Sequence, residues 1–289
     1  MSARERQSNR VPVSVLEAGC FAQTWERKYY RLGEVFVKRS LRPREFQIGV
    51  DGPHVPRVGN ARLINEAATL KYIRENTDIP VPSLICDFQD DESHYLIMEW
   101  VEGVNMIDIP DEEKPQVYAE IKKHLATLRN LKSTTLGAPN GVVIPPYRVS
   151  KVTKNDSWNL KVSDIAEYVF CHNDLSQQNI ILDPSTFKIK AIIDWEYAGF
   201  FPGYFEKEFF MRLGHSDIMK GEFDDRPKLL EFLESQQLSV RSNSAALLHI
   251  HKNLTNIVPS LIISELVLAR NAVGLKYNRE IPKHYVLQI

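Results

Sequence analysis

The sequence has little of what marks several large protein classes. It contains only 3 cysteines in 289 residues, and they are too widely spaced for a disulfide framework or a zinc site. Basic and acidic residues nearly balance, at 36 and 37, so no positive excess favours nucleic acid or an anionic membrane. A Gly-x-x-x-x-Gly-Lys-Ser/Thr loop is also missing, which excludes a P-loop enzyme. We expect no nucleic-acid partner and no membrane partner.

Long hydrophobic runs are absent too. The longest apolar stretch, residues 261–275, contains two charged residues and is shorter than the roughly 20 residues of a membrane helix. We expect it to form a buried helix. The first ten residues are polar and charged, with no apolar signal-peptide core after them. With Cys20, Cys86 and Cys171 interpreted as reduced core thiols, these features predict a cytoplasmic protein.

The most informative part of the sequence is a pair of segments, residues 170–182 and 192–196. The first reads Phe-Cys-His-Asn-Asp-Leu-Ser-Gln-Gln-Asn-Ile-Ile-Leu and the second Ile-Ile-Asp-Trp-Glu. Each contains an apolar run typical of a short strand, and Asp183-Pro184 is a turn signal between the runs. We therefore predict a small two-stranded ribbon that gathers the polar residues of both segments at one edge.

Three side chains at this edge, Asp174, Asn179 and Asp194, suit phosphoryl transfer. Carboxylate and amide oxygens are ligands that Mg²⁺ prefers, and a further carboxylate can serve as a general base. Each residue taken alone also fits a simpler interpretation, in which Asp174 and Asp194 cap turns and His172 is a hydrogen-bonded core residue. The complete ordered set favours the catalytic interpretation.

The pattern His-x-Asp-x-x-x-x-Asn followed by Ile-Asp-Trp-Glu resembles the catalytic and metal-binding loops of the aminoglycoside phosphotransferase family, and is most similar to its fungal members. The resemblance covers about residues 29–205. It implies an α+β, two-lobed protein-kinase-like fold, with a small antiparallel-sheet N-lobe and a larger helical C-lobe. It also implies that Asp174 accepts the proton of a substrate hydroxyl while His172 fixes the loop. Asn179 and Asp194 would hold Mg²⁺ against the phosphates of ATP.

The N-terminal part offers the elements of a nucleotide-binding lobe. Residues 29–38 predict a β-hairpin that ends at Lys38. A helix is predicted over residues 60–76, N-capped by its first residue, with Glu66 at the border of its buried face. In the kinase-like fold a strand Lys pairs with a helix Glu and holds the α and β phosphates. Lys38 and Glu66 match that pair by order and context, with Arg39 as a competing candidate for the cation.

An apolar strand ending near residue 98 leads into Glu99-Trp100-Val101-Glu102-Gly103, which matches the hinge of the related kinases. The match implies that Met98 lines the adenine pocket. It also implies that the carbonyl of Glu99 and the amide of Val101 contact the adenine edge. The predicted units are residues 1–98, a strand-rich nucleotide-binding lobe, residues 99–103, the hinge, and residues 104–289, a helical lobe with the catalytic loop and the acceptor site.

Beyond the hinge the pattern predicts an amphipathic helix over about residues 117–131, a loop over 133–157 and mostly helical structure after Glu196. Between residues 196 and 225, seven acidic residues outnumber three basic ones. This excess fits either an acidic wall for an amine-bearing acceptor or the solvated faces of helices.

The sequence therefore predicts an enzyme that uses ATP and Mg²⁺ to phosphorylate a hydroxyl group of a small molecule. The alternative is a non-catalytic kinase-like scaffold or regulatory protein. Its only support is that no Gly-x-Gly-x-x-Gly loop precedes the first predicted hairpin, where Gly19 is the only nearby glycine. Transfer to a protein side chain has less support, because Ser176 stands where protein kinases carry a Lys. The oligomeric state is left open.

Overall fold

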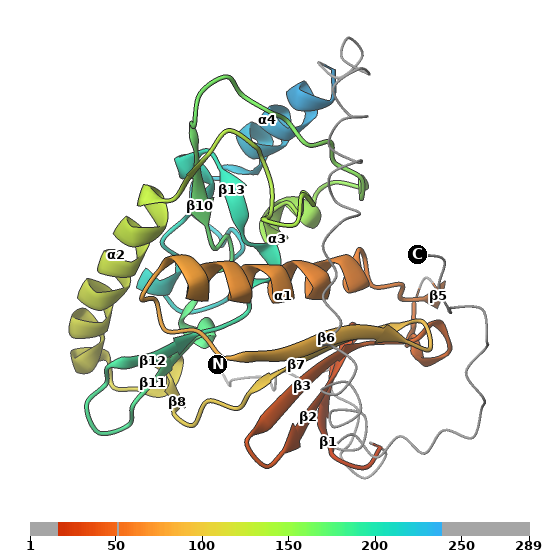
Figure 1. Ribbon diagram of the computed structural model, residues 1–289, viewed down its shortest axis with the longest axis vertical. Helices are drawn as coiled ribbons and strands as arrows, with labels where there is room; N and C mark the ends of the chain where they lie inside the picture. Colours follow the sequence, from red (N-terminus) through yellow and green to blue (C-terminus); the bar gives the residue numbers. More distant parts are fainter. Residues whose placement is uncertain (1–16, 51, 239–289) are drawn as a thin grey trace, which may run out of the picture.

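A five-stranded antiparallel sheet forms the N-terminal part of the chain (Figure 1). In the computed structural model, the described residues are 17–50 and 52–238. The predicted buried helix at 261–275 lies outside them. The strands, in their order across the sheet, are β1 (Cys20–Gln23), β2 (Arg27–Leu32), β3 (Val35–Ser40), β7 (Ser93–Glu99) and β6 (Leu84–Asp90). The predicted antiparallel N-terminal sheet is confirmed, although β3 continues two residues beyond Lys38.

Helix α1 (Gly59–Asn76) lies along the sheet, between it and the C-terminal part of the chain (Figure 1). Its buried stripe, Leu63, Ala67, Leu70 and Ile73, has the helical spacing expected from the sequence. The predicted N-cap was wrong. The cap is Val58, which has a left-handed backbone conformation. Asn60 lies inside the first turn and does not cap it, because its Oδ1 accepts a hydrogen bond from the Ser40 hydroxyl at 2.6 Å.

The C-terminal part combines helices with short strands. The helices are α2 (Lys114–Asn130), α3 (Tyr147–Ser150) and α4 (Arg226–Leu238), with 3₁₀ turns between elements. The strands form two three-stranded sheets, one of β13 (Gly199–Phe201), β10 (Tyr168–Cys171) and β9 (Lys132–Ser133), the other of β12 (Ile189–Ile192), β11 (Ile180–Leu182) and β8 (Val104–Asn105). A two-residue pair, β4 (Ile48–Gly49) and β5 (Gly52–Pro53), lies in the connection before α1.

Residues 197–225 depart from the prediction of mostly helical structure. They form strand β13 and a series of 3₁₀ turns, and α-helix begins only at Arg226. Pro202 and the glycines of this stretch interrupt any helical repeat. Five phenylalanine side chains of this stretch are buried from β13 and from the 3₁₀ turns instead, and they are Phe200, Phe201, Phe205, Phe209 and Phe210. The predicted loop over 133–157 is correct except for the short helix α3.

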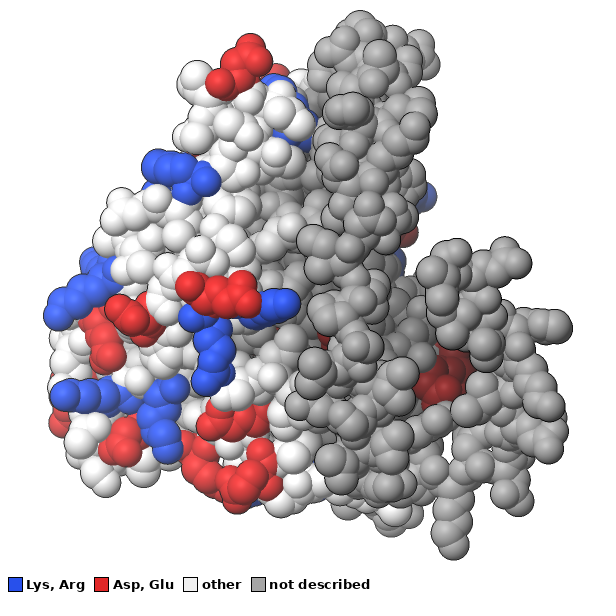
Figure 2. Space-filling model, viewed as in Figure 1, with Lys and Arg blue, Asp and Glu red and all other residues white. Residues whose placement is uncertain are grey.

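One hydrophobic core joins the two parts of the chain. It contains the buried stripe of α1, Leu96 and Met98 of β7, and residues of α2 and β10. A smaller cluster covers the other face of the sheet. Among the described residues no helix is long and apolar enough to cross a membrane. On the face shown in Figure 2, basic and acidic side chains are intermingled over the described surface.

Candidate active site

The predicted ribbon is present and has the predicted turn. Strands β11 and β12 pair antiparallel, and Asp183 Oδ1 accepts the N–H groups of Ser185 and Thr186 at 3.0 and 2.9 Å. The amide of Ile193 donates to the Asn179 carbonyl at 3.0 Å. This contact places the start of β11 beside the end of β12, so residues 179 and 194 lie next to each other.

His172 holds the loop before the ribbon. It is fully buried, its Nε2 donates to the Ile193 carbonyl at 3.0 Å, and its Nδ1 accepts the Asp174 amide at 3.2 Å. Burial lowers the pKa of His172 to about 4, so the ring is neutral with its proton on Nε2. Asn173 and Asp194 both have left-handed backbone, at φ 67° and 63°. Such strained positions are typical of functional loops.

Asp174 and Asn179 are in direct contact. Asn179 Nδ2 donates to the Asp174 carbonyl at 2.8 Å and lies 3.4 Å from its Oδ2. Burial raises the pKa of Asp174 to about 8, helped by the nearby carboxylate of Asp194 and opposed by the hydroxyl of Ser216. A carboxylate with a raised pKa is a stronger base than a free one.

Lys38, Glu66 and Asp194 form one ion-paired cluster. Lys38 Nζ lies 2.7 Å from Glu66 Oε1 and also contacts Asp194 Oδ1. Although burial favours the neutral amine, the two carboxylates raise the pKa of Lys38 above its usual value. Burial also opposes ionisation of Asp194, but Lys38 lowers the pKa of Asp194. The strand cation and the helix acid predicted from the sequence thus meet beside the end of β12.

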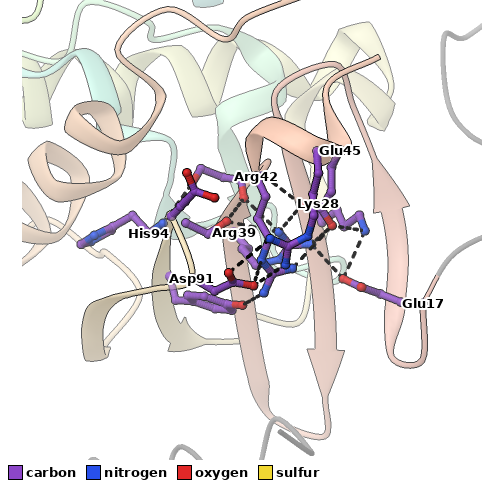
Figure 3. Close-up of polar contacts among 12 residues, drawn as sticks. Glu17, Lys28, Arg39, Arg42, Glu45, Asp91 and His94 are labelled. Carbon is purple, nitrogen blue, oxygen red and sulfur yellow. Dashed lines mark hydrogen bonds and ion pairs between the residues drawn. The ribbon is translucent and has the colours of Figure 1, made fainter. Parts of the chain in front are cut away.

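Arg39 belongs to a different network (Figure 3). Successive residues of a strand point to opposite faces, and the Arg39 side chain bonds Glu45 at 2.6 and 2.9 Å and Glu17 at 2.9 Å. It also donates to the hydroxyl of Tyr30 at 3.1 Å. The structure therefore places Lys38, and not Arg39, beside Asp194.

A pocket of about 300 Å³ opens between the first strands of the sheet and the segment after β7. Met98, Glu99 and Val101 all line it, and Lys38 and Asp194 lie in its wall. The remaining lining residues are Phe21, Tyr29, Phe36, Pro82, Trp100, Asn105, Ile181 and Ile193. Apolar walls with a few polar groups are typical of a cofactor pocket. The contacts predicted for the Glu99 carbonyl and the Val101 amide stay predictions.

The donor set suits Mg²⁺. The Asp194 carboxylate contacts Lys38, and the Asn179 carbonyl bonds the amide of Ile193, the residue before Asp194. Mg²⁺ binds through one or two carboxylates plus phosphate and water oxygens. Within residues 17–50 and 52–238, no group of three or more His, Cys, Asp or Glu side chains could hold a metal. These two residues would therefore hold the ion together with the phosphates of a nucleotide.

Sequence reasoning gave no role to a second ion-paired set. Glu196 pairs with Arg27 of β2 and, at 3.2 Å, with Arg62 of α1. Arg62 also pairs with Glu26 at 2.5 Å, and Asn65 Nδ2 donates to the Glu196 carbonyl at 2.9 Å. This set ties the turn before β2, the start of α1 and the segment after Asp194 to one another. Only the position of Glu196 in the Ile-Asp-Trp-Glu motif signalled its importance.

The acids of residues 196–225 mostly have partners within the chain. Glu206 Oε2 accepts the amides of His172 and Asn173 at 2.5 and 3.2 Å, which makes it a support of the loop that contains Asp174. The other pairs are Asp225 with Arg148, Asp217 with Lys151 and Arg226, Glu222 with Arg212, and Asp224 with Arg226. The segment is neither a free acidic wall nor a set of solvated helix faces.

Comparisons with known proteins found one matching family model and a set of similar solved structures. The family model described as choline/ethanolamine kinase matches residues 84–234. The chain is similar to aminoglycoside-3'-phosphotransferase of type VIII, with TM-score 0.42 and 18% identity over 66% of this chain and 72% of that one. It is also similar to aminoglycoside phosphotransferase APH(3'')-Id from Streptomyces rimosus in complex with ADP and streptomycin, with TM-score 0.44 and 18% identity over 66% and 75%.

Aminoglycoside phosphotransferase APH(4)-Ia, in a ternary complex with AMP-PNP and hygromycin B, is a further similar structure, with TM-score 0.42 and 13% identity over 64% of this chain and 67% of that one. No curated protein matches the sequence. The family model spans more than half of the 289 residues and includes the loop from His172 to Asp194. The chain therefore belongs to the choline/ethanolamine kinase family of small-molecule phosphotransferases.

Proposed function

We propose that this kinase transfers the γ-phosphoryl group of ATP to a hydroxyl group of a small acceptor, with Asp174 as the base. The observation that carries the proposal is the convergence of two groups of side chains. Lys38, Glu66 and Asp194 form one ion-paired cluster, and Lys38 and Asp194 of this cluster lie in the wall of the 300 Å³ pocket. Asp174 and Asn179 lie beside it and contact each other. This is the set that phosphoryl transfer requires.

The nucleotide would lie with its base in the 300 Å³ pocket, next to Met98, Glu99 and Val101. Lys38 extends from the same pocket wall and would hold the α and β phosphates. Its ion pair with the buried Glu66 fixes the ammonium in place. Asn179 and Asp194 would hold Mg²⁺, which neutralises phosphate charge during transfer.

The transfer forms a bond between the acceptor oxygen and the γ-phosphorus and breaks the bond from that phosphorus to the β–γ bridging oxygen, which leaves with ADP. The proton of the acceptor hydroxyl passes to the Asp174 carboxylate. The loop geometry around His172 fixes where that carboxylate lies, because its ring bonds both the Asp174 amide and the Ile193 carbonyl. Asp174 thus orients the hydroxyl before it accepts the proton.

The direct test is Mg²⁺-dependent release of ADP by wild type, Asp174→Asn and Asp194→Asn. The acceptor panel contains choline and ethanolamine, which the family name suggests, streptomycin, and uncharged alcohols. Asp174→Asn should lower kcat by about 10²- to 10⁴-fold while ADP still binds. Asp194→Asn should lose Mg²⁺-dependent nucleotide binding.

Asp164→Asn is the matched control, since Asp164 is exposed and should leave both readouts unchanged. Nucleotide binding without turnover for every acceptor would favour the alternative of a non-catalytic scaffold. A complete lack of nucleotide binding by wild type would overturn the proposal.

A further inference from the structure

We propose that a second pocket binds the acceptor, and that this acceptor is an uncharged, ring-bearing hydroxyl compound and not a cation. The pocket has a volume of about 290 Å³ and lies between residues 54–62 and residues 143–158. We call it the acceptor pocket. The inference rests on the proposed kinase function and adds the chemical class of the acceptor.

The acceptor pocket lies next to the catalytic loop. Tyr197 and Arg62 line it. Asn173, the residue before Asp174, donates from Nδ2 to the Tyr197 carbonyl at 2.9 Å. Burial raises the pKa of Tyr197, and the nearby negative charge of Asp174 contributes to the rise. The acceptor pocket shares no lining residue with the pocket assigned to the nucleotide. Asp174 does not line it, and the contact that joins it to the loop of Asp174 is the hydrogen bond from Asn173 to the Tyr197 carbonyl.

Aromatic and apolar side chains form much of the wall. Tyr147, Trp158 and Tyr197 supply three rings, and the two tyrosine rings lie edge to face with centroids 6.0 Å apart. Val58 and Pro145 add apolar surface. The volume is about twice that of a cavity of roughly 150 Å³ that binds benzene. A molecule of one or two rings therefore fits.

The charged residues of the wall are already paired. Arg57 lies 2.6 Å from Asp156 and also donates to the carbonyls of Ser150 and Asn155 at 2.5 and 2.9 Å. The second acid of the wall, Glu26, is held by Arg62 at 2.5 Å. Neither acid is left over to balance a charged amine.

The basic residues also occupy faces of the aromatic rings. Lys151 Nζ lies 5.3 Å from the centroid of the Tyr147 ring, and Arg62 Cζ lies 5.4 Å from that of Tyr197. A cage for a quaternary ammonium group needs ring faces that are open to the ligand. Here Lys151 and Arg62 each lie over one of the two tyrosine rings and would repel a second cation at those rings, which disfavours choline-like and polyamine acceptors.

Two hydrogen-bond donors of the wall lack a partner within the described part of the chain. They are Arg62 Nε and Trp158 Nε1, both buried, and the Arg62 side chain is only 4% exposed. Both groups carry a hydrogen and neither can accept one. Both atoms are covered by the chain itself, so a ligand in the pocket meets the rings and the paired charges of the wall and not these donors.

The test compares matched probes for binding to the full chain in the presence of ADP and Mg²⁺, by ligand-observed NMR titration. Choline is paired with 3,3-dimethylbutan-1-ol, which replaces the charged nitrogen by carbon, and 2-(2-naphthyl)ethanol represents a two-ring neutral alcohol. We expect the neutral member of the pair to bind more tightly than choline. The naphthyl alcohol should bind at least tenfold more tightly than choline.

Trp158→Ala should weaken binding of the naphthyl alcohol at least tenfold. Trp158→Phe, which keeps a ring but loses the N–H, should have a smaller effect. Phe223→Ala is the control, because Phe223 is 80% exposed and does not line the pocket. Thermal unfolding and ADP affinity measured on each variant show that it is folded.

Choline binding as tightly as its neutral counterpart would overturn the inference, as would no binding of either neutral probe or binding that Trp158→Ala leaves unchanged. Failure of the proposed kinase function has a different signature. In that case ADP would not bind or no acceptor would turn over, while the naphthyl alcohol would still bind in a Trp158-dependent way.

Discussion

Replacing Arg39 by Met should lower the free energy of unfolding by about 3 kcal/mol. Its side chain is 1% exposed. The guanidinium donates to both oxygens of Glu45, to Glu17 at 2.9 Å and to the Tyr30 hydroxyl at 3.1 Å. Figure 3 shows Arg39 of β3 beside Glu45, from the turn that follows β3, and beside Glu17, which precedes β1. Met would fill much of the space but would leave the carboxylates without their main cation.

The size of the expected loss in unfolding free energy depends on the partners that Glu45 and Glu17 keep when Arg39 is removed. Removing one partner of a buried ion pair costs about 3–5 kcal/mol. Glu45 would still have Lys28 at 2.9 Å and the Arg42 amide at 2.9 Å. The Glu17 side chain is already 43% exposed, so water can solvate it. Both facts place the cost at the lower end of the range, which corresponds to a fall in Tm of roughly 6–12 °C for a chain of this size.

Urea unfolding at pH 7, followed by circular dichroism and by tryptophan fluorescence, measures the effect. Arg44→Met is the matched control, because the Arg44 side chain is 58% exposed and, within residues 17–50 and 52–238, is paired with Asp91 alone. An exposed pair of this kind contributes little to stability, because water and salt screen it. Equal losses for Arg39→Met and Arg44→Met would refute the reasoning that burial makes the Arg39 network important.

Three further predictions concern other sites. Burial opposes ionisation of Glu45, but its ion pairs and hydrogen bonds hold its pKa well below the usual 4.5. The ionised Glu45 therefore stabilises the fold above pH 4.5, and this contribution is lost as the pH falls below 4.5. Wild type should lose stability more steeply in acid than Glu45→Gln. Urea midpoints that fall in parallel for the two proteins would contradict this. Glu206→Gln should lower kcat about tenfold, or about 1.4 kcal/mol, and leave the acceptor KM unchanged. Glu208→Gln is the control and should change neither constant. An altered acceptor KM for Glu206→Gln would instead support a direct contact between Glu206 and the acceptor. Gly103→Ala should cost about 1–3 kcal/mol in urea unfolding, because its Cβ would lie 2.5 Å from Ile181 Cγ2, and unchanged stability would show that this contact relaxes freely.

The parts of the site that the sequence predicts correctly are those built from short-range patterns. The ribbon, its turn at Asp183 and the loop of His172 lie within one stretch of 25 residues, where spacing and turn residues largely determine what meets. The hairpin of β2 and β3 and the buried stripe of α1 follow from the periods of strands and helices. The Lys38–Glu66 contact came from the family resemblance, because no local pattern joins the two residues.

The parts that could not be predicted depend on tertiary contacts. The left-handed Val58 cap of α1 is set by the connection before the helix and by packing, since a β-branched residue disfavours that conformation. Residues 197–225 have helix-forming members but bury aromatic side chains from strand β13 and from 3₁₀ turns. The pairing of Arg62 with Glu196 joins positions 134 apart in the sequence, and neither residue type alone distinguishes it from an exposed charge.

These long-range contacts give α1 a role in both pockets. Arg62 and Glu66 are four residues apart and thus lie on neighbouring turns of one helical face. Glu66 fixes Lys38 in the nucleotide pocket, while Arg62 lines the acceptor pocket and pairs with Glu196, two residues after Asp194. Asn65, fully buried between them, bonds the carbonyl of Glu196 at 2.9 Å and so locks the helix to this segment. A change that shifts α1 should therefore alter the affinities for nucleotide and acceptor together, whereas a change in the wall of one pocket should alter only one.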